Sequence, residues 1–243
     1  SLAGFLIDAI GVEAVYFSVT VLSVMVFVTT LQLPTTGTTD PGSDSVWSDI
    51  VDGAKYIHLC PALVPLLALV FLRGFFTMPY RTLMPKYAQD VMNLDASGLG
   101  ILVAAPGAGS LISSLVMASL GDFRGKGRLM LGSGIVLGVA LVLFANTEVF
   151  LLVLILLALV GATSNVCMVT NRTLLQENCY APYLGRVMSA YMMMFGLTQL
   201  GTIPVGALAD RFGVPSVLAV LGTLFVLAIL FLWVKQPTIK TLE

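Results

Sequence analysis

Arg73 is the residue whose chemistry is hardest to explain by packing alone. It stands in the apolar run LALVFLRGFFTMPYR, past the middle of a stretch long enough to cross a bilayer. An ionisable group inside a membrane span is costly, and by default it marks a functional site. We therefore expect Arg73 to face the interior of a helix bundle, where it could bind an anionic substrate group or an acidic side chain.

Uncharged polar residues in the later apolar runs could line the same interior. These substrate-cavity candidates are Asn165, Asn171, Tyr191 and Gln199. Amides and hydroxyls also hydrogen-bond between helices, so structural packing is the alternative explanation. No acidic residue is expected deep within a span. The acids next to the apolar stretches lie near the expected helix ends on the outer side of the membrane, and they are Asp8, Glu13, Asp90, Asp95, Glu148 and Asp210.

A basic loop, SLGDFRGKGR at 119–128, offers a second kind of chemistry. It combines one acid with three cations, and the four residues are Asp122, Arg124, Lys126 and Arg128. An acid at a helix end can bind a neighbouring helix N-terminus or a basic side chain. The cations alone could instead set the membrane topology and bind anionic headgroups, and both interpretations stay open.

Several kinds of chemistry have no sequence signal in this chain. No phosphate-binding P-loop, H-E-x-x-H or G-x-S-x-G pattern occurs, so we expect no enzyme activity and no nucleotide. Cys60, Cys167 and Cys179 lack metal-ligand spacing and are predicted to pack as small hydrophobes, without a metal or cofactor. A net charge of −1 gives no reason to expect nucleic acid as a partner.

The composition predicts a polytopic all-α membrane protein. Hydrophobic residues make up 58% of the 243 residues and charged residues 10%, against about 25% charged in soluble domains. About seven continuous apolar stretches are long enough to span a bilayer, preceded by the end of an eighth helix before residue 8. Their expected bounds are 12–33, 62–80, 98–120, 129–146, 149–170, 187–208 and 214–234.

Small residues and surface patterns refine this outline. We expect two stripes of small residues to be helix contact faces, namely Gly100, Ala104 and Ala108, and Gly134 and Gly138.

Residues 34–48 are polar and turn-forming. Residues 47–58 follow with amphipathic helical spacing that suits a helix at the membrane surface. Lys and Arg concentrate in alternate loops, which predicts that those loops and the C-terminus are cytoplasmic.

An internal repeat indicates how the helices are organised. Residues 4–15 match residues 206–217 at six positions without gaps, including Asp8 with Asp210 and Gly11 with Gly213. The copies are separated by an even number of expected helices, so they would be parallel and each would form an outer turn. A commonly occurring hairpin turn is the alternative. If the repeat is real, the intact protein has twelve helices and this chain supplies the last seven.

On these residues the chain resembles the Major Facilitator Superfamily. The loop at 119–128 is similar to the second copy of the family's G-x-x-x-D-[RK]-x-G-[RK]-[RK] motif. Segments 85–88, 98–109 and 185–189 are similar to the drug- and siderophore-exporting transmembrane secretion effector branch. The first copy of the loop motif, and the antiporter motif apart from its possible end at Gly4, are absent from this sequence.

The resemblance implies a domain organisation. Residues 1–33 would be the end of helix five and helix six of the N-terminal half. Residues 34–60 would be a cytoplasmic loop with a surface helix, and residues 61–243 a C-terminal six-helix bundle. The loop at 119–128 would help to latch one conformation, and the partner would be a missing N-terminal half of the same protein.

The resemblance also implies a function. The chain would belong to a secondary transporter in the bacterial inner membrane that exports drugs or siderophores by proton antiport. The proton-coupling carboxylate would lie outside this sequence. Import of a small solute is the alternative, followed by a non-transporting receptor or structural protein.

Overall fold

The computed structural model describes residues 12–32, 46–121 and 123–236. The chain divides into two compact units, Ser1–Trp47 and Ser48–Glu243. Every regular element of the described residues is helical, which confirms the predicted all-α class.

The first unit contains α2 (Val12–Leu31), a 20-residue apolar helix close to the predicted 12–33. Its hydroxyl groups bond to its own backbone, as when the hydroxyls of Thr20 and Thr30 donate to the carbonyl oxygens of Tyr16 and Val26 at 2.8 Å. Such bonds satisfy polar side chains within one helix, which a lipid environment requires.

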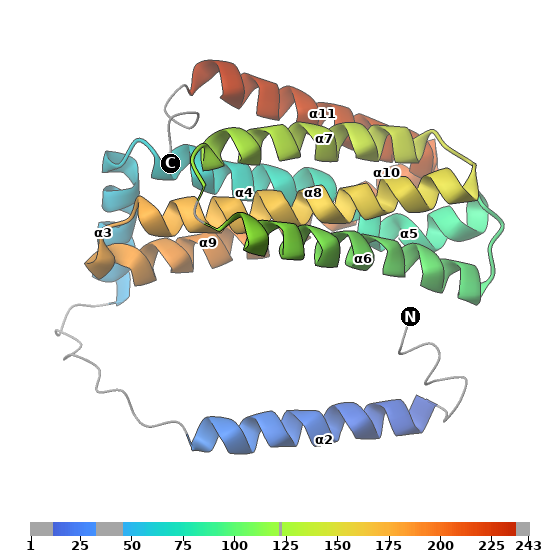
Figure 1. Cartoon of the computed structure of the whole chain (residues 1–243), viewed down its shortest axis with the longest axis horizontal. Coiled ribbons are helices and arrows are strands. Elements are labelled where there is room, and N and C mark those ends of the chain that lie inside the picture. Colours follow the sequence, from blue (N-terminus) through green and yellow to red (C-terminus); the bar gives the residue numbers. More distant parts are fainter. Residues whose placement is uncertain (1–11, 33–45, 122, 237–243) are drawn as a thin grey trace. The chain divides into compact units, whose positions relative to one another are not determined.

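The second unit contains the remaining helices, shown in Figure 1, apart from the first two residues of α3. They are α3 (Val46–Leu59), α4 (Leu63–Thr77), α5 (Pro79–Asp90), α6 (Ala96–Leu120), α7 (Lys126–Ala145), α8 (Phe150–Glu177), η1 (Ala181–Tyr183), α9 (Leu184–Thr198), η2 (Gln199–Gly201), α10 (Thr202–Phe212) and α11 (Val214–Lys235). Among the described residues, six helical stretches are long and apolar enough to cross a membrane. Helix α2, taken from Tyr16 to Leu31, is apolar but shorter.

The first span of the second unit continues well beyond the predicted end at residue 80. Helices α4 and α5 form one stretch, Leu63–Asp90, in which Pro79 occupies the first position of α5. A proline is tolerated there because the first turn of a helix has no intrahelical partner for its N–H. The polar residues of α5 end the apolar run but not the helix, since Tyr80, Leu83 and Tyr87 still pack in the core.

The stretch predicted at 187–208 is longer and interrupted. It runs from Ala181 to Phe212 and tightens into the 3-10 turn η2 between α9 and α10. Gly201 is buried in this turn, against the ring of Phe75 in α4. The predicted stretch 149–170 likewise continues to Glu177, which adds about two turns to α8.

Helices α4, α6 and α7 of the second unit pack against α8. Helix α8 lies along both α6 and α7, while α11 packs against α7 and α4, and α4 packs against α9 (Figure 1). The fully buried side chains come from several of these helices, including Leu66, Phe144, Leu157 and Phe225.

The contact between α6 and α8 depends on two glycines. A Cβ atom added at Gly109 would lie 1.8 Å from the carbonyl oxygen of Ala158, and one at Gly161 would lie 2.0 Å from that of Pro106. No larger residue fits at either position unless the helices separate. Close approach of backbones is what holds helices together in lipid, where burial of apolar side chains gives little driving force.

Within the described bundle, the first predicted contact stripe does not make the close contact of α6, whereas the second stripe is confirmed in part. Ala104 and Ala108 of α6 are exposed in the described bundle, and Gly109 makes the close contact instead. In α7 the prediction holds, because a Cβ added at Gly138 would lie 2.5 Å from the Cγ2 atom of Val226 in α11.

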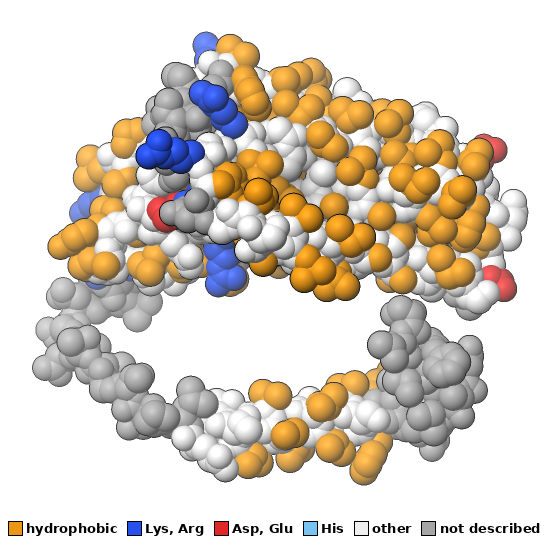
Figure 2. All heavy atoms as spheres, in the orientation of Figure 1, with side chains coloured by type: hydrophobic (Ala, Val, Ile, Leu, Met, Phe, Trp, Pro, Cys, Tyr) orange, Lys and Arg blue, Asp and Glu red, His pale blue; other side chains and the backbone are white. Residues whose placement is uncertain are grey.

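The ends of the second unit differ in charge. The α6–α7 connection and the end of α11 lie at one end, where Lys and Arg side chains gather on the face shown in Figure 2. The α7–α8 and α10–α11 connections lie at the opposite end, where that face shows acidic side chains. Gly213 joins α10 to α11 with φ 82°, as the sequence predicts for this turn. Gly11, its predicted counterpart, and Asp8, the predicted counterpart of Asp210, lie outside the described residues.

The glycine contact predicts a stability difference within α6. Gly109→Ala should destabilise the protein by about 1–3 kcal/mol, because the added methyl group collides with the backbone of α8. Gly107→Ala is the matched control on the same helix, since no described atom lies within 4 Å of its added Cβ. Thermal unfolding of the two purified variants in detergent measures the difference. Equal stabilities would show that α6 and α8 do not approach as described.

The N-terminus of α6 predicts a pH dependence. Asp95 accepts hydrogen bonds from the backbone N–H of Gly98 at 2.9 Å and the hydroxyl of Ser97 at 2.8 Å, and these bonds lower the pKa of its carboxyl. A lowered pKa means that the stabilisation is present at neutral pH and is lost as the pH falls through the folded-state value. Asp95→Asn keeps a capping side chain without titrating. Its thermal stability should therefore fall less between pH 6 and pH 3 than that of the unmodified protein.

Candidate functional site

Helix α4 turns Arg73 into the bundle. The residue is only 4% exposed, and its Nη1 atom donates to the hydroxyl of Ser164 in α8 at 3.3 Å. The expected orientation of Arg73 is therefore confirmed. In the part of the chain that the structure describes, no carboxylate lies within ion-pair distance of its guanidinium.

A narrow pocket surrounds Arg73 between α4, α8 and α9. Its lining brings together three of the predicted cavity residues with apolar side chains, and consists of Leu69, Val70, Arg73, Cys167, Met168, Asn171 and Tyr191. The pocket leaves no room for a water molecule. Tyr191 is 6% exposed, so α9 closes one side of the pocket.

Asn171 links α8 to two neighbouring helices. Its Nδ2 atom donates to the carbonyl oxygen of Leu66 in α4 at 3.0 Å and approaches the sulfur of Met130 in α7 at 3.5 Å. Its Oδ1 atom is buried, and among the described residues it has no hydrogen-bond partner. A buried acceptor without a donor is costly, so this oxygen calls for an explanation beyond packing.

The other two cavity candidates lie elsewhere. The Nδ2 atom of Asn165 donates to the hydroxyls of Ser113 and Ser114 in α6 at 3.0 and 2.9 Å, so this residue belongs to the α6–α8 contact. Gln199 is exposed at the 3-10 turn η2. Ser113 and Ser114 were not among the predicted residues, although they stand three and four residues after Ser110, a spacing that places each of them on the same helix face as Ser110.

The basic loop turns tightly between α6 and α7. Gly121 and Gly125 have φ values of 59° and 89°, in the left-handed region that glycine adopts at least cost. Arg124 and Arg128 are exposed on either side of Gly125. Asp122, the acidic residue of the predicted latch, lies outside the described residues.

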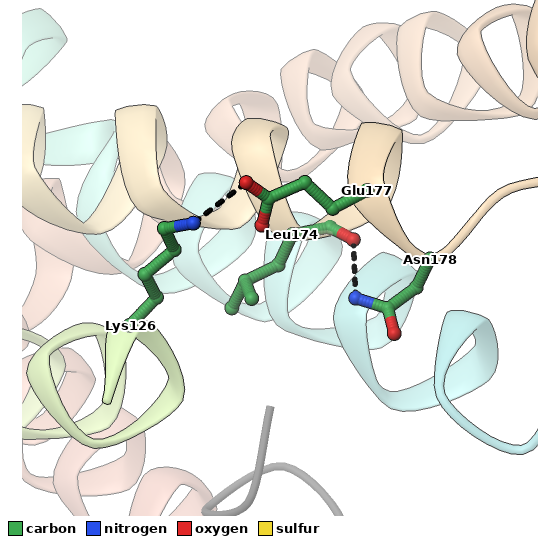
Figure 3. A network of polar contacts seen from close by, with 4 residues as sticks. All are labelled: Lys126, Leu174, Glu177 and Asn178. Atoms are coloured by element: carbon green, nitrogen blue, oxygen red, sulfur yellow. Dashed lines mark hydrogen bonds and ion pairs between the residues drawn. The ribbon is translucent and has the colours of Figure 1, made fainter. Parts of the chain in front are cut away.

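Lys126 differs from the other two cations of the loop because its side chain is turned inward. Only 9% of the side chain is exposed, and its Nζ atom lies 2.6 Å from the Oε1 atom of Glu177 at the end of α8 (Figure 3). Both residues stand at the unfavourable end of their own helix dipoles, since a cation begins α7 and an acid ends α8. The ion pair offsets both penalties and joins the two helix ends.

A more open pocket lies beside this ion pair. It has a volume of about 330 Å³ between α6, α8 and the loop, and is lined by Ser114, Met117, Ala118, Gly121, Phe123, Lys126, Val169, Thr170 and Thr173. The hydroxyl of Thr170 is buried there, and the described residues offer it no hydrogen-bond partner.

Helix α3 is attached to the same end of the bundle. The ring of Tyr56 stacks on that of Tyr183 at a centroid distance of 4.3 Å, and its hydroxyl accepts from the backbone N–H of Tyr180 at 2.9 Å. The guanidinium of Arg186 lies 5.4 Å from the centroid of the Tyr183 ring. Burial raises the pKa of the neighbouring Cys179 thiol, which disfavours a reactive thiolate and fits the predicted packing role.

Comparison with known proteins agrees with these features. The sequence model of the Major Facilitator Superfamily matches residues 1–200. The chain is 28% identical over 156 residues to the staphyloferrin A transporter of Staphylococcus aureus, covering 63% of this chain and 38% of that protein. It is 27% identical over 211 residues to the multidrug efflux pump Tap of Mycolicibacterium fortuitum, covering 85% and 50%.

A third relative extends the comparison. The chain is 25% identical over 181 residues to macrolide efflux protein A of Streptococcus pyogenes, covering 73% of this chain and 45% of that protein. The matches therefore cover half or less of the length of these relatives.

The Lys126–Glu177 pair predicts a measurable coupling between α7 and α8. Lys126→Met and Glu177→Gln should each lower the free energy of unfolding. The double variant should lose less than the sum of the two single losses, and the difference is a coupling energy of about 0.5–3 kcal/mol. The comparison pair is Lys55–Asp52, which is 3.6 Å apart with side chains 69% and 52% exposed. Lys55→Met should change stability by less than about 0.5 kcal/mol. Strictly additive losses at Lys126 and Glu177 would contradict the pairing.

Proposed function

Because the chain belongs to the Major Facilitator Superfamily, we propose that it forms part of a secondary transporter that exports small molecules by proton antiport. Drugs and siderophores are the substrate classes that we favour. Two of the relatives are named as efflux proteins and one as the transporter of staphyloferrin A, which supports export.

The observation that carries this proposal is the buried pocket around Arg73. A cation, an amide and a phenol from three different helices converge there, and apolar side chains cover much of the face of the bundle shown in Figure 2. We propose that Arg73, Asn171 and Tyr191 contact the substrate when the pocket opens. Asn165 and Gln199 line other parts of the path.

For the architecture we propose that α2 and the second unit are helices six to twelve of a twelve-helix transporter. Residues 34–60, including most of α3, would join the two six-helix halves, and the first half would be the partner of this bundle. The basic end of the second unit, with the C-terminus, would face the cytoplasm, in accord with the excess of Lys and Arg there.

The loop between α6 and α7 is proposed to act as a conformational latch. Arg124 and Arg128 are exposed and available to the other half of the protein, while Lys126 and Glu177 hold the loop against α8. Asp122 would bind a helix N-terminus of that half. Opening and closing of the substrate path would break and remake these contacts.

The coupling carboxylate is proposed to belong to the preceding helices of the complete protein. Among the described residues, the acids of the membrane-spanning helices stand at or near helix ends, as Asp90, Glu177 and Asp210 do. A carboxylate that exchanges protons with both sides of a membrane has to be reached from the middle of the transport path.

The test uses the product of the complete gene in inside-out membrane vesicles. With an acidic interior, the vesicles should accumulate a radiolabelled macrolide or a radiolabelled carboxylate siderophore. Collapse of the proton gradient should abolish the accumulation. Arg73→Met should reduce the initial rate by tenfold or more without lowering the amount of protein in the membrane.

Two outcomes would contradict the proposal. Accumulation only in right-side-out vesicles would indicate import, and accumulation that is insensitive to the proton gradient would exclude antiport. The isolated 243-residue chain serves as the negative control, since we expect no flux from a single half.

A further inference from the structure

The positive charge of Arg73 is buried without a compensating acid among the described residues. The guanidinium has five N–H donors, yet its only described polar partner is the hydroxyl of Ser164 at 3.3 Å. A buried charge is stable only when it is paired and hydrogen-bonded. The described residues therefore supply no anion to this site.

In the same pocket, the described residues offer no hydrogen-bond donor to one buried acceptor. Asn171 donates through its Nδ2 atom to Leu66, while its buried Oδ1 atom has no partner in the described part of the chain. Arg73 and Asn171 both line the pocket. It therefore contains a cation without a described counter-ion and an acceptor without a described donor. A water molecule does not fit in this closed form.

The rest of the lining is apolar, with Leu69, Val70 and Met168 beside these two polar groups. We infer that the pocket, once opened, binds an amphipathic organic carboxylate that carries a separate hydroxyl group. The carboxylate would pair with Arg73, the hydroxyl would donate to the Oδ1 atom of Asn171, and the apolar part would contact the aliphatic side chains. This inference rests on the proposed function and defines the substrate class at that site.

Charge balance favours a carboxylate over a phosphate. The pocket lining contains one cationic residue, which a monoanion neutralises. A phosphate monoester carries nearly two charges at neutral pH and would leave one of them buried and unpaired. The planar guanidinium also matches a carboxylate with two parallel hydrogen bonds.

The test measures binding to the complete gene product purified in detergent. The probe is 3-hydroxybenzoate, which has a carboxylate, an apolar ring and a hydroxyl too distant from the carboxylate to bond to it. Benzoate lacks only the donor, and its dissociation constant should be roughly threefold to tenfold higher. 3-Hydroxybenzyl alcohol keeps the ring and the phenolic hydroxyl but replaces the carboxylate with an uncharged hydroxymethyl group, and it should not bind measurably.

Matched variants connect the preference to the pocket. Arg73→Met should abolish the preference for the acid over the alcohol. Ser164→Asp places a carboxylate beside Arg73, so it should raise the melting temperature of the ligand-free protein and eliminate binding of 3-hydroxybenzoate. Asn146→Asp adds the same charge at the exposed end of α7 and should leave binding as it is.

Each result decides the inference. Equal binding of acid and alcohol, absence of binding by 3-hydroxybenzoate, or acid binding that survives Arg73→Met would overturn it. If macrolide flux in vesicles persists while no carboxylate binds, the inference fails and the proposed function stands. If the carboxylates bind as expected and no proton-driven flux occurs, the site is an anion site and the proposed function fails.

Discussion

The close approach of α6 and α8 at Gly109 and Gly161 is the constraint on which the rest of the bundle depends. In lipid, apolar side chains gain little from burial, so helices adhere where their backbones can nearly touch. The glycines bring carbonyl oxygens of one helix within about 2 Å of where the other would carry a Cβ atom. Once α8 is fixed against α6, its remaining faces are presented to α4 and α7.

The polar residues of α8 use those faces. Ser164 accepts from Arg73, Asn171 donates to the backbone of α4, and Glu177 pairs with the first residue of α7. Because each bond joins α8 to another helix, the same contacts that specify the packing also set the positions of the candidate site. A change in the tilt of α8 would act on the pocket around Arg73 and on the basic loop together.

The inward orientation of Arg73 follows from local features of the sequence, whereas the full length of the helices does not. A charged residue inside an apolar run faces protein rather than lipid for energetic reasons that do not depend on the fold. The extension of the first span to Asp90 was not predicted, because Pro79 and the polar residues of α5 interrupt the apolar run. Only the packing of Tyr80 and Tyr87 in the core explains why the helix continues.

The amino-acid sequence by itself determined the class of protein, the approximate spans and the candidate polar residues, since apolar length is decisive when lipid is the solvent. The tertiary structure decided which of those residues meet. Helices α6, α7 and α8 do not separate an apolar face from a polar face, so hydropathy does not encode how each is rotated. Rotation put Gly109 instead of Ala108 against α8, and it placed Asn171 with Arg73 but Asn165 with the serines of α6.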